Sequence, residues 1–121
     1  MNYELTEDGV LNVGEAWEKV LEFMKNRFEK DADVKAILFV IGLRELATKK
    51  TKFTKEEKQD LMNLALCTIM TPDGYFNVKH LDKEGWPVWE QIKPFPVMNN
   101  KDQEEFIKLH IIKYFMEEKL I

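Results

Sequence analysis

The side chains best suited to metal binding or nucleophilic chemistry are few in this sequence. One cysteine and two histidines stand far apart, at Cys67, His80 and His110. A zinc site needs three or four converging cysteine, histidine or carboxylate ligands. His80 and Asp82 form a His-x-Asp pair, and in an extended segment residues two apart point to the same side. Further ligands are too scarce, so we predict no metal site and a solvent-exposed His80.

Cys67 and His110 both lie in apolar stretches. Apolar surroundings raise the pKa of a thiol and make it unreactive, which disfavours Cys67 as a nucleophile. His110 is expected to be a half-buried packing residue or a surface neighbour of Glu105 or Glu117, because no partner for acid–base catalysis can be placed beside it. The sequence therefore predicts no catalytic residue.

Nucleotide and calcium sites are not indicated either. The five glycines are scattered singly and form no phosphate-binding loop. The acidic residues between positions 73 and 84 lack the alternating ligands and central glycine of an EF-hand. We predict no cofactor.

Length and composition predict one globular domain, residues 1–121. The chain is 45% hydrophobic and 33% charged, and its size suits a single core. A lone cysteine excludes an intrachain disulfide, and the acidic start lacks the pattern of a signal peptide, so a cytoplasmic location is expected. The apolar run 36–43 is far shorter than the roughly 20 residues of a membrane span. The net charge of −4 disfavours binding to nucleic acid or membrane.

Hydrophobic periodicity predicts four helices, over residues 13–30, 33–47, 55–70 and 101–119. Asn12 is expected to cap the first helix, and Thr54 with Glu57 forms a capping box for the third. Asn99 and Asn100 offer caps for the fourth. The second helix is apolar in every direction and is expected to be central, although a buried strand is the alternative for its core.

Residues 75–99 interrupt this helical pattern with prolines and aromatic side chains. Segments 75–81 and 86–92, around a turn at 82–85, would form a β-hairpin with Pro87 on an unpaired edge. The predicted fold is mainly α. It is a compact four-helix domain with a short β-hairpin-like or irregular insertion between the third and fourth helices, preceded by an N-terminal arm, residues 1–11.

The insertion also carries the best candidate for a partner-binding surface. Tryptophan and tyrosine dominate protein interfaces, and proline stiffens the segment that presents them. The alternative is that the tryptophans fold back to cap the helical core. The candidate residues are Tyr75, Phe76, Trp86, Trp89 and Phe95. Our leading hypothesis is a non-enzymatic protein-interaction domain, an adaptor, regulator or inhibitor of an unknown protein partner.

A second candidate surface is basic. Lysines in the connection before the third helix and at its start could contact phosphates or an acidic partner. A solvated connection is the favoured interpretation, because only Phe53 interleaves these lysines. The residues are Lys49, Lys50, Lys52, Lys55 and Lys58.

The alternative function is a small-molecule-binding domain or enzyme. Its pocket would lie between the helices and segment 75–98, with Tyr75, His80, Asp82 and Trp86 at the mouth. A homodimer also stays open, since it would cover apolar helix surface that one small core does not absorb.

Overall fold

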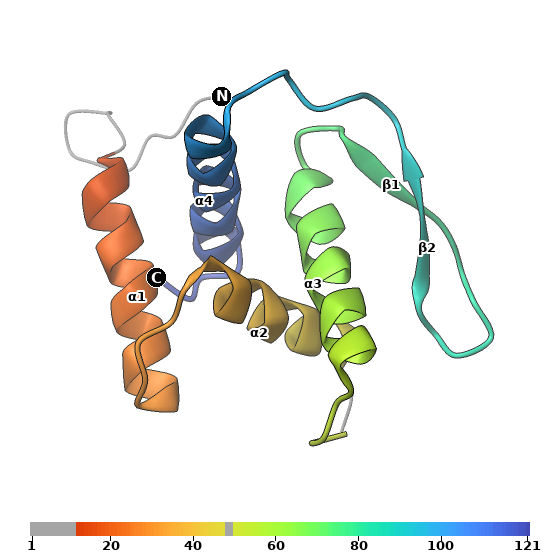
Figure 1. Ribbon diagram of the computed structural model, residues 1–121, viewed down its shortest axis with the longest axis horizontal. Coiled ribbons are helices and arrows are strands. Elements are labelled where there is room, and N and C mark those ends of the chain that lie inside the picture. The colour runs from red at the N-terminus through yellow and green to blue at the C-terminus, as the bar shows by residue number, and fades with distance from the viewer. Residues whose placement is uncertain (1–11, 48–49) are drawn as a thin grey trace. The chain divides into compact units, whose positions relative to one another are not determined.

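The computed structural model describes residues 12–47 and 50–121. These form the helices α1 (Val13–Phe28), α2 (Val34–Leu46), α3 (Lys55–Met70) and α4 (Asn100–Glu117). Strands β1 (Phe76–Leu81) and β2 (Pro87–Gln91) follow α3 and precede α4 in the sequence, and they form a two-stranded antiparallel sheet (Figure 1). The chain is thus mainly α but not a pure four-helix bundle. The arm predicted for residues 1–11 lies outside the described residues.

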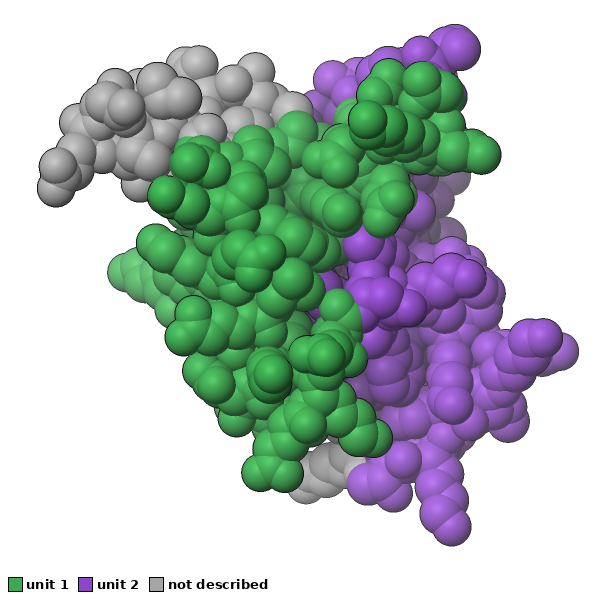
Figure 2. Space-filling model, turned by 60° about the vertical axis from the view of Figure 1, so that its left-hand side comes forward, with its two compact units in different colours: residues 1–32, 99–121 green, residues 33–98 purple. Residues whose placement is uncertain are grey.

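The chain divides into two compact units, coloured separately in Figure 2. One unit comprises residues 1–32 with 99–121, and therefore contains α1 and α4. The other comprises residues 33–98, with α2, α3 and the sheet. The single domain expected from the sequence stays a prediction.

Each helix begins at a side chain that caps it. The oxygen of the capping side chain accepts a hydrogen bond from the backbone N–H three residues later, at 2.8 to 3.1 Å. Such a bond satisfies a donor that has no partner inside the helix. The caps are Asn12, Asp33, Thr54 and Asn99. The predicted cap at Asn12 and the capping box before α3 are confirmed.

The first two helices end at a left-handed residue. Glu29 has φ 58° and Ala47 has φ 54°. A left-handed residue breaks the helical hydrogen-bond ladder and directs the chain away. The predicted range 13–30 was therefore two residues too long at its end, whereas the predicted range 55–70 matches α3.

In the unit formed by residues 1–32 and 99–121, α1 packs beside α4. Phe23 meets Phe115 edge to face, with ring centroids 5.3 Å apart. Lys108 Nζ lies 5.2 Å from the centre of the Trp17 ring, within cation–π range. These contacts join the two helices across a sequence separation of about ninety residues.

His110 is the buried polar side chain of α4, with 1% of its surface exposed. Its Nδ1 lies 2.8 Å from the carbonyl oxygen of Phe106, and its ring stacks on that of Phe106 with centroids 4.5 Å apart. The sequence prediction of a half-buried or surface position was wrong. A histidine can occupy a core when a hydrogen bond one turn away satisfies its ring nitrogen.

In the unit formed by residues 33–98, α2 crosses α3 at close range. A Cβ built on Gly42 would lie 2.8 Å from the carbonyl carbon of Leu61, so only a glycine permits this approach. Beside the crossing, Phe39 meets Phe53 edge to face at 5.6 Å. The helix prediction for this apolar segment, over the alternative of a strand, is confirmed.

A turn fixed by Asp82 joins the two strands. Its carboxylate accepts hydrogen bonds from the backbone N–H groups of Glu84 and Trp86, both at 2.9 Å. Gly85 follows with φ 86°, a conformation that favours glycine. Pro87 begins β2, and in a two-stranded sheet each strand has an unpaired edge that tolerates proline. The predicted β-hairpin is confirmed.

None of the described helices is long and apolar enough to cross a membrane.

Candidate partner-binding groove

Four of the five predicted interface aromatics contact one another. The Tyr75 and Phe95 rings lie 5.1 Å apart, and Phe76 lies 5.8 Å from Phe95 and 6.5 Å from Trp89. Lys93 Nζ sits 4.4 Å from the centre of the Tyr75 ring. All four rings are only half-buried. This cluster therefore braces the hairpin against the segment that follows it, while each ring keeps some exposed surface.

A β-bulge interrupts the hairpin at Lys79. Val78 pairs with Trp89, and the next pair joins His80 to Val88, so Lys79 has no opposite residue. An extra residue in one strand reverses the alternation of side chains beyond it. Between the bulge and the tip of the hairpin, the side chains of β1 therefore alternate in the opposite order from those before the bulge.

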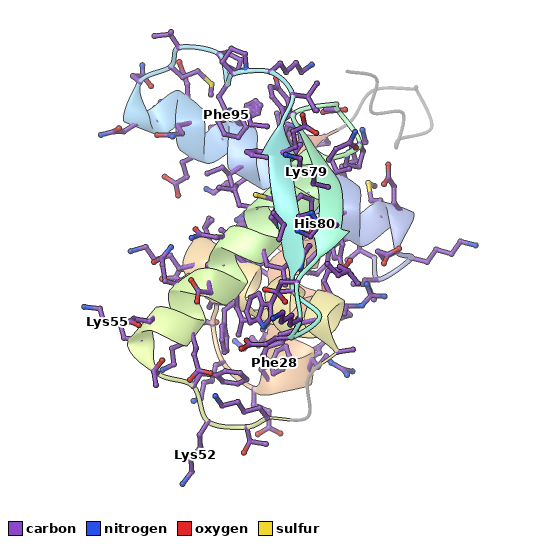
Figure 3. All side chains as sticks on the ribbon, turned by 90° about the vertical axis from the view of Figure 1, so that its right-hand side faces the viewer. Phe28, Lys52, Lys55, Lys79, His80 and Phe95 are labelled. Atoms are coloured by element: carbon purple, nitrogen blue, oxygen red, sulfur yellow. The ribbon has the colours of Figure 1, made fainter. Side chains whose placement is uncertain are left out.

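Because of the bulge, Leu81 and not His80 lies on the face of the hairpin that is turned toward α3. Leu81 pairs with Pro87, and so lies on the same face as Val78 and Trp89. His80 lies on the opposite face and is exposed (Figure 3). Without the bulge, strict alternation would have put His80 in the place of Leu81.

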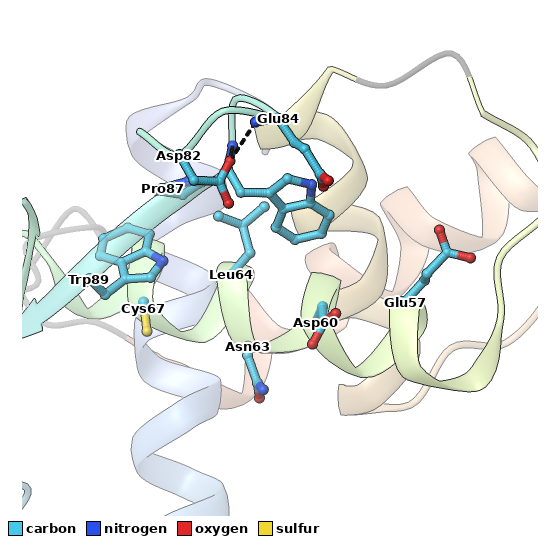
Figure 4. Close-up of a pocket in the computed structure, with 10 residues that line it drawn as sticks. Glu57, Asp60, Asn63, Leu64, Cys67, Asp82, Glu84, Pro87 and Trp89 are labelled. Atoms are coloured by element: carbon cyan, nitrogen blue, oxygen red, sulfur yellow. Dashed lines mark hydrogen bonds between the residues drawn. The ribbon is translucent and has the colours of Figure 1, made fainter. Parts of the chain in front are cut away.

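A hollow of about 420 Å³ lies between α3 and the tip of the hairpin (Figure 4). We call it the acidic groove, because its lining among the described residues includes four carboxylates and no lysine or arginine. From α3 come Glu57, Asp60, Asn63, Leu64 and Cys67. From the hairpin come Asp82, Glu84, Trp86, Pro87 and Trp89.

Two of the four carboxylates are engaged within the protein. Lys50 Nζ donates to Glu57, and the backbone N–H of Thr54 donates to the other Glu57 oxygen at 2.9 Å. The bond from Lys50, together with that from Thr54, lowers the pKa of Glu57. Glu57 thus already has a cation as its partner, and Asp82 holds the turn through one of its two oxygens, so both carboxylates help to shape the groove.

The other two carboxylates remain available. Asp60 and Glu84 are exposed, and neither side chain makes a hydrogen bond or ion pair to another described residue. Asp60 projects from α3 and Glu84 from the hairpin turn, so each wall of the groove contributes one (Figure 4). A charged ligand in the groove can therefore reach an unpaired carboxylate on either side.

A second hollow, of about 470 Å³, adjoins the groove. Leu64, Pro87 and Trp89 line both hollows, so these three form a ridge between them. We call the second one the apolar hollow, after the exposed Val78 and Leu81 of β1 in its lining. The concave surface thus continues on both sides of Trp89.

Cys67 lies in the wall of the acidic groove and is partly buried. Burial raises the pKa of its thiol. This direction agrees with the apolar setting predicted from the sequence, and it keeps the thiolate, the reactive form, scarce at neutral pH.

The pocket mouth predicted for a small molecule is assembled only in part. Asp82 and Trp86 line the acidic groove, whereas Tyr75 packs on Phe95 and His80 lies on the other face of the hairpin. The rule that residues two apart in a strand point to one side does not apply to His80 and Asp82, because β1 ends at Leu81 and Asp82 belongs to the turn. In the described part of the chain, no three histidine, cysteine, aspartate or glutamate residues are grouped so that they could hold a metal ion.

The basic patch is only partly described, since Lys49 lies outside the described residues. Lys50 pairs with Glu57 and lies 5.7 Å from the centre of the Phe53 ring. Lys52 and Lys55 extend away from the ribbon (Figure 3), and Lys58 is also exposed. Phosphate or partner binding by this patch stays a prediction.

Reasoning from the sequence missed the α3 wall of the groove. Glu57, Asp60, Leu64 and Cys67 recur at steps of three and four, so they share one face of the helix. That spacing was available, but it does not show that the hairpin returns over this face.

No family model matches this chain, and no curated protein or solved structure is significantly similar to it.

Proposed function

We propose that this chain is a non-enzymatic protein-interaction domain that binds its partner through the acidic groove. One observation carries this proposal. Trp86 and Trp89 are half-buried and line a hollow whose rim is polar and exposed. Aromatic anchors in a concave centre, bordered by polar residues, are the usual arrangement of side chains that dominate binding energy.

The extent of the concave surface favours a protein segment over a compact ligand. The acidic groove and the apolar hollow share the ridge of Leu64, Pro87 and Trp89. A peptide crossing this ridge would place apolar side chains on one side and polar or charged side chains on the other. A small molecule would occupy only one of the two hollows.

The second candidate function is binding of a small molecule in the acidic groove. Its volume of about 420 Å³ favours this, because ligand pockets span about 300 to 1,000 Å³. Thermal shift against a ligand library separates the two functions, since a bound ligand stabilises only the folded state. A ligand whose stabilisation disappears in Trp86→Ala would favour this second candidate.

The test of the interaction function is capture of partners from native lysate. Wild type is compared with Trp86→Ala and Trp89→Ala, after circular dichroism confirms that each variant is folded. Ile92→Ala is the matched control, because Ile92 is 53% exposed and lines neither hollow. We expect a protein retained by wild type and by the control and lost by both tryptophan variants. Capture that is equal in all four proteins would refute the proposal.

A further inference from the structure

We propose that the acidic groove recognises a basic segment of another protein, with an arginine or lysine side chain between Asp60 and Glu84. This inference rests on the proposed function, and names the chemistry of the partner. It starts from the charge of the groove, which four carboxylates line and no lysine or arginine of residues 12–47 and 50–121 does.

The two unpaired carboxylates are the ones that a ligand can bind without competing with an internal bond. Glu57 is held by Lys50 and Thr54, and Asp82 by the backbone of its turn. Asp60 and Glu84 make no ion pair to a described residue and are exposed on opposite walls. A cation between them would gain two opposite charges without displacing an internal hydrogen bond.

The aromatic part of the lining favours the same ligand. Trp86 and Trp89 are half-buried in the groove, and the face of a tryptophan ring attracts a cation. A guanidinium group suits this combination best, because it stacks on aromatic rings and donates paired hydrogen bonds to carboxylates. The net charge of −4 would further favour approach of a basic partner.

The test is a selection of random twelve-residue peptides displayed on phage, with wild type as the bait. Enriched peptides are synthesised and their affinities measured by fluorescence anisotropy. The first variant is Asp60→Asn with Glu84→Gln, whose exposed side chains hold no part of the fold. The matched control is Glu56→Gln with Glu90→Gln, which changes net charge equally at two exposed positions outside the groove.

We expect the enriched peptides to carry arginine or lysine. Their binding should weaken about five- to ten-fold in the Asp60/Glu84 variant and stay unchanged in the control. Raising salt from about 50 mM to about 500 mM should also weaken it, because exposed charge pairs are screened.

Two other results would overturn the inference in distinguishable ways. Peptides without basic residues that are lost in Trp86→Ala would refute the basic partner while the interaction function stands. If no peptide depends on the tryptophans or on the carboxylate pair, both proposals fall. Analytical ultracentrifugation tests whether the groove binds a second copy of the chain. If wild type is a dimer and the Asp60→Asn, Glu84→Gln variant is a monomer, the groove is a self-association site and the inference of a different basic partner is refuted.

Discussion

The backbone of Gly42 in α2 lies directly against the carbonyl group of Leu61 in α3. A Cβ at position 42 would approach the Leu61 carbonyl carbon to 2.8 Å, closer than real Cβ atoms come to any neighbour. Both residues are buried, and Leu61 has no exposed surface. The missing side chain of Gly42 therefore sets how closely the helices cross, and α3 is the helix that forms one wall of the acidic groove.

Gly42→Ala should lower the free energy of unfolding by about 1 to 3 kcal/mol, because the added methyl group overpacks the crossing. Alanine otherwise stabilises a helix interior by about 1 kcal/mol relative to glycine. Urea unfolding followed by circular dichroism measures the change. Gly14→Ala in α1 is the control, since the one described atom that its Cβ would meet is Asn12 Oδ1, at an ordinary contact distance of 3.4 Å. Equal or greater stability of Gly42→Ala would contradict the close crossing.

Local signals in the sequence were sufficient to locate the helices. The Thr54 and Glu57 capping box and the Asn12 cap depend on residues only three apart, and both form as predicted. The turn at 82–85 was likewise indicated by its residue types and is held by Asp82. Features whose physical cause lies within one turn of chain are readable without knowledge of the fold.

Features that depend on contacts between residues far apart in the sequence could not be predicted. The bulge at Lys79 arises from the register between two strands, and it alone moves His80 away from the face of Trp89. The α3 wall at Asp60 is part of a site only because the hairpin returns over it. The burial of His110 also depends on how α4 packs. The apolar residues around it in the sequence are compatible with full burial and with half-burial, so they could not predict which occurs.

Asp82→Ala should loosen the tip of the hairpin, because its carboxylate accepts two backbone hydrogen bonds within the turn. Such bonds contribute about 1 to 2 kcal/mol together. Hydrogen exchange of the Glu84 and Trp86 amides should accelerate, as measured by NMR. Asp82→Asn retains an acceptor oxygen and should preserve most of the protection, and Lys83→Ala is the control in the same turn. Unchanged exchange in Asp82→Ala would show that the turn holds without this side chain.

Stability should depend on pH through Glu57. Its pKa is lowered from the ordinary value of 4.5, chiefly by the bond from Lys50 and then by that from Thr54. A carboxylate with a lower pKa in the folded state stabilises the fold above its unfolded pKa, and this contribution is lost as pH falls through the folded value. The difference in urea midpoint between wild type and Glu57→Gln should therefore be full at pH 7 and shrink below about pH 4.5.

The control for this pH dependence is Glu56→Gln. Glu56 lies in the same first turn of α3 and is exposed, so its substitution changes the charge equally without removing the capping box. The difference in urea midpoint between Glu56→Gln and wild type should vary less with pH than the difference between Glu57→Gln and wild type. A Glu57→Gln curve that runs parallel to wild type from pH 7 to pH 3 would exclude the bond to Lys50 as a stabilising interaction.

Substitution of the two histidines should change the stability of the protein to very different extents. His110 is 1% exposed, stacks on Phe106 and lies within hydrogen-bond distance of its carbonyl oxygen. His110→Ala would leave a cavity and should lower the free energy of unfolding by about 2 to 4 kcal/mol. His80→Ala removes an exposed side chain and should change it by less than about 0.5 kcal/mol. Urea unfolding of both variants measures the contrast, and similar values would mean that His110 does not form part of the core of α4.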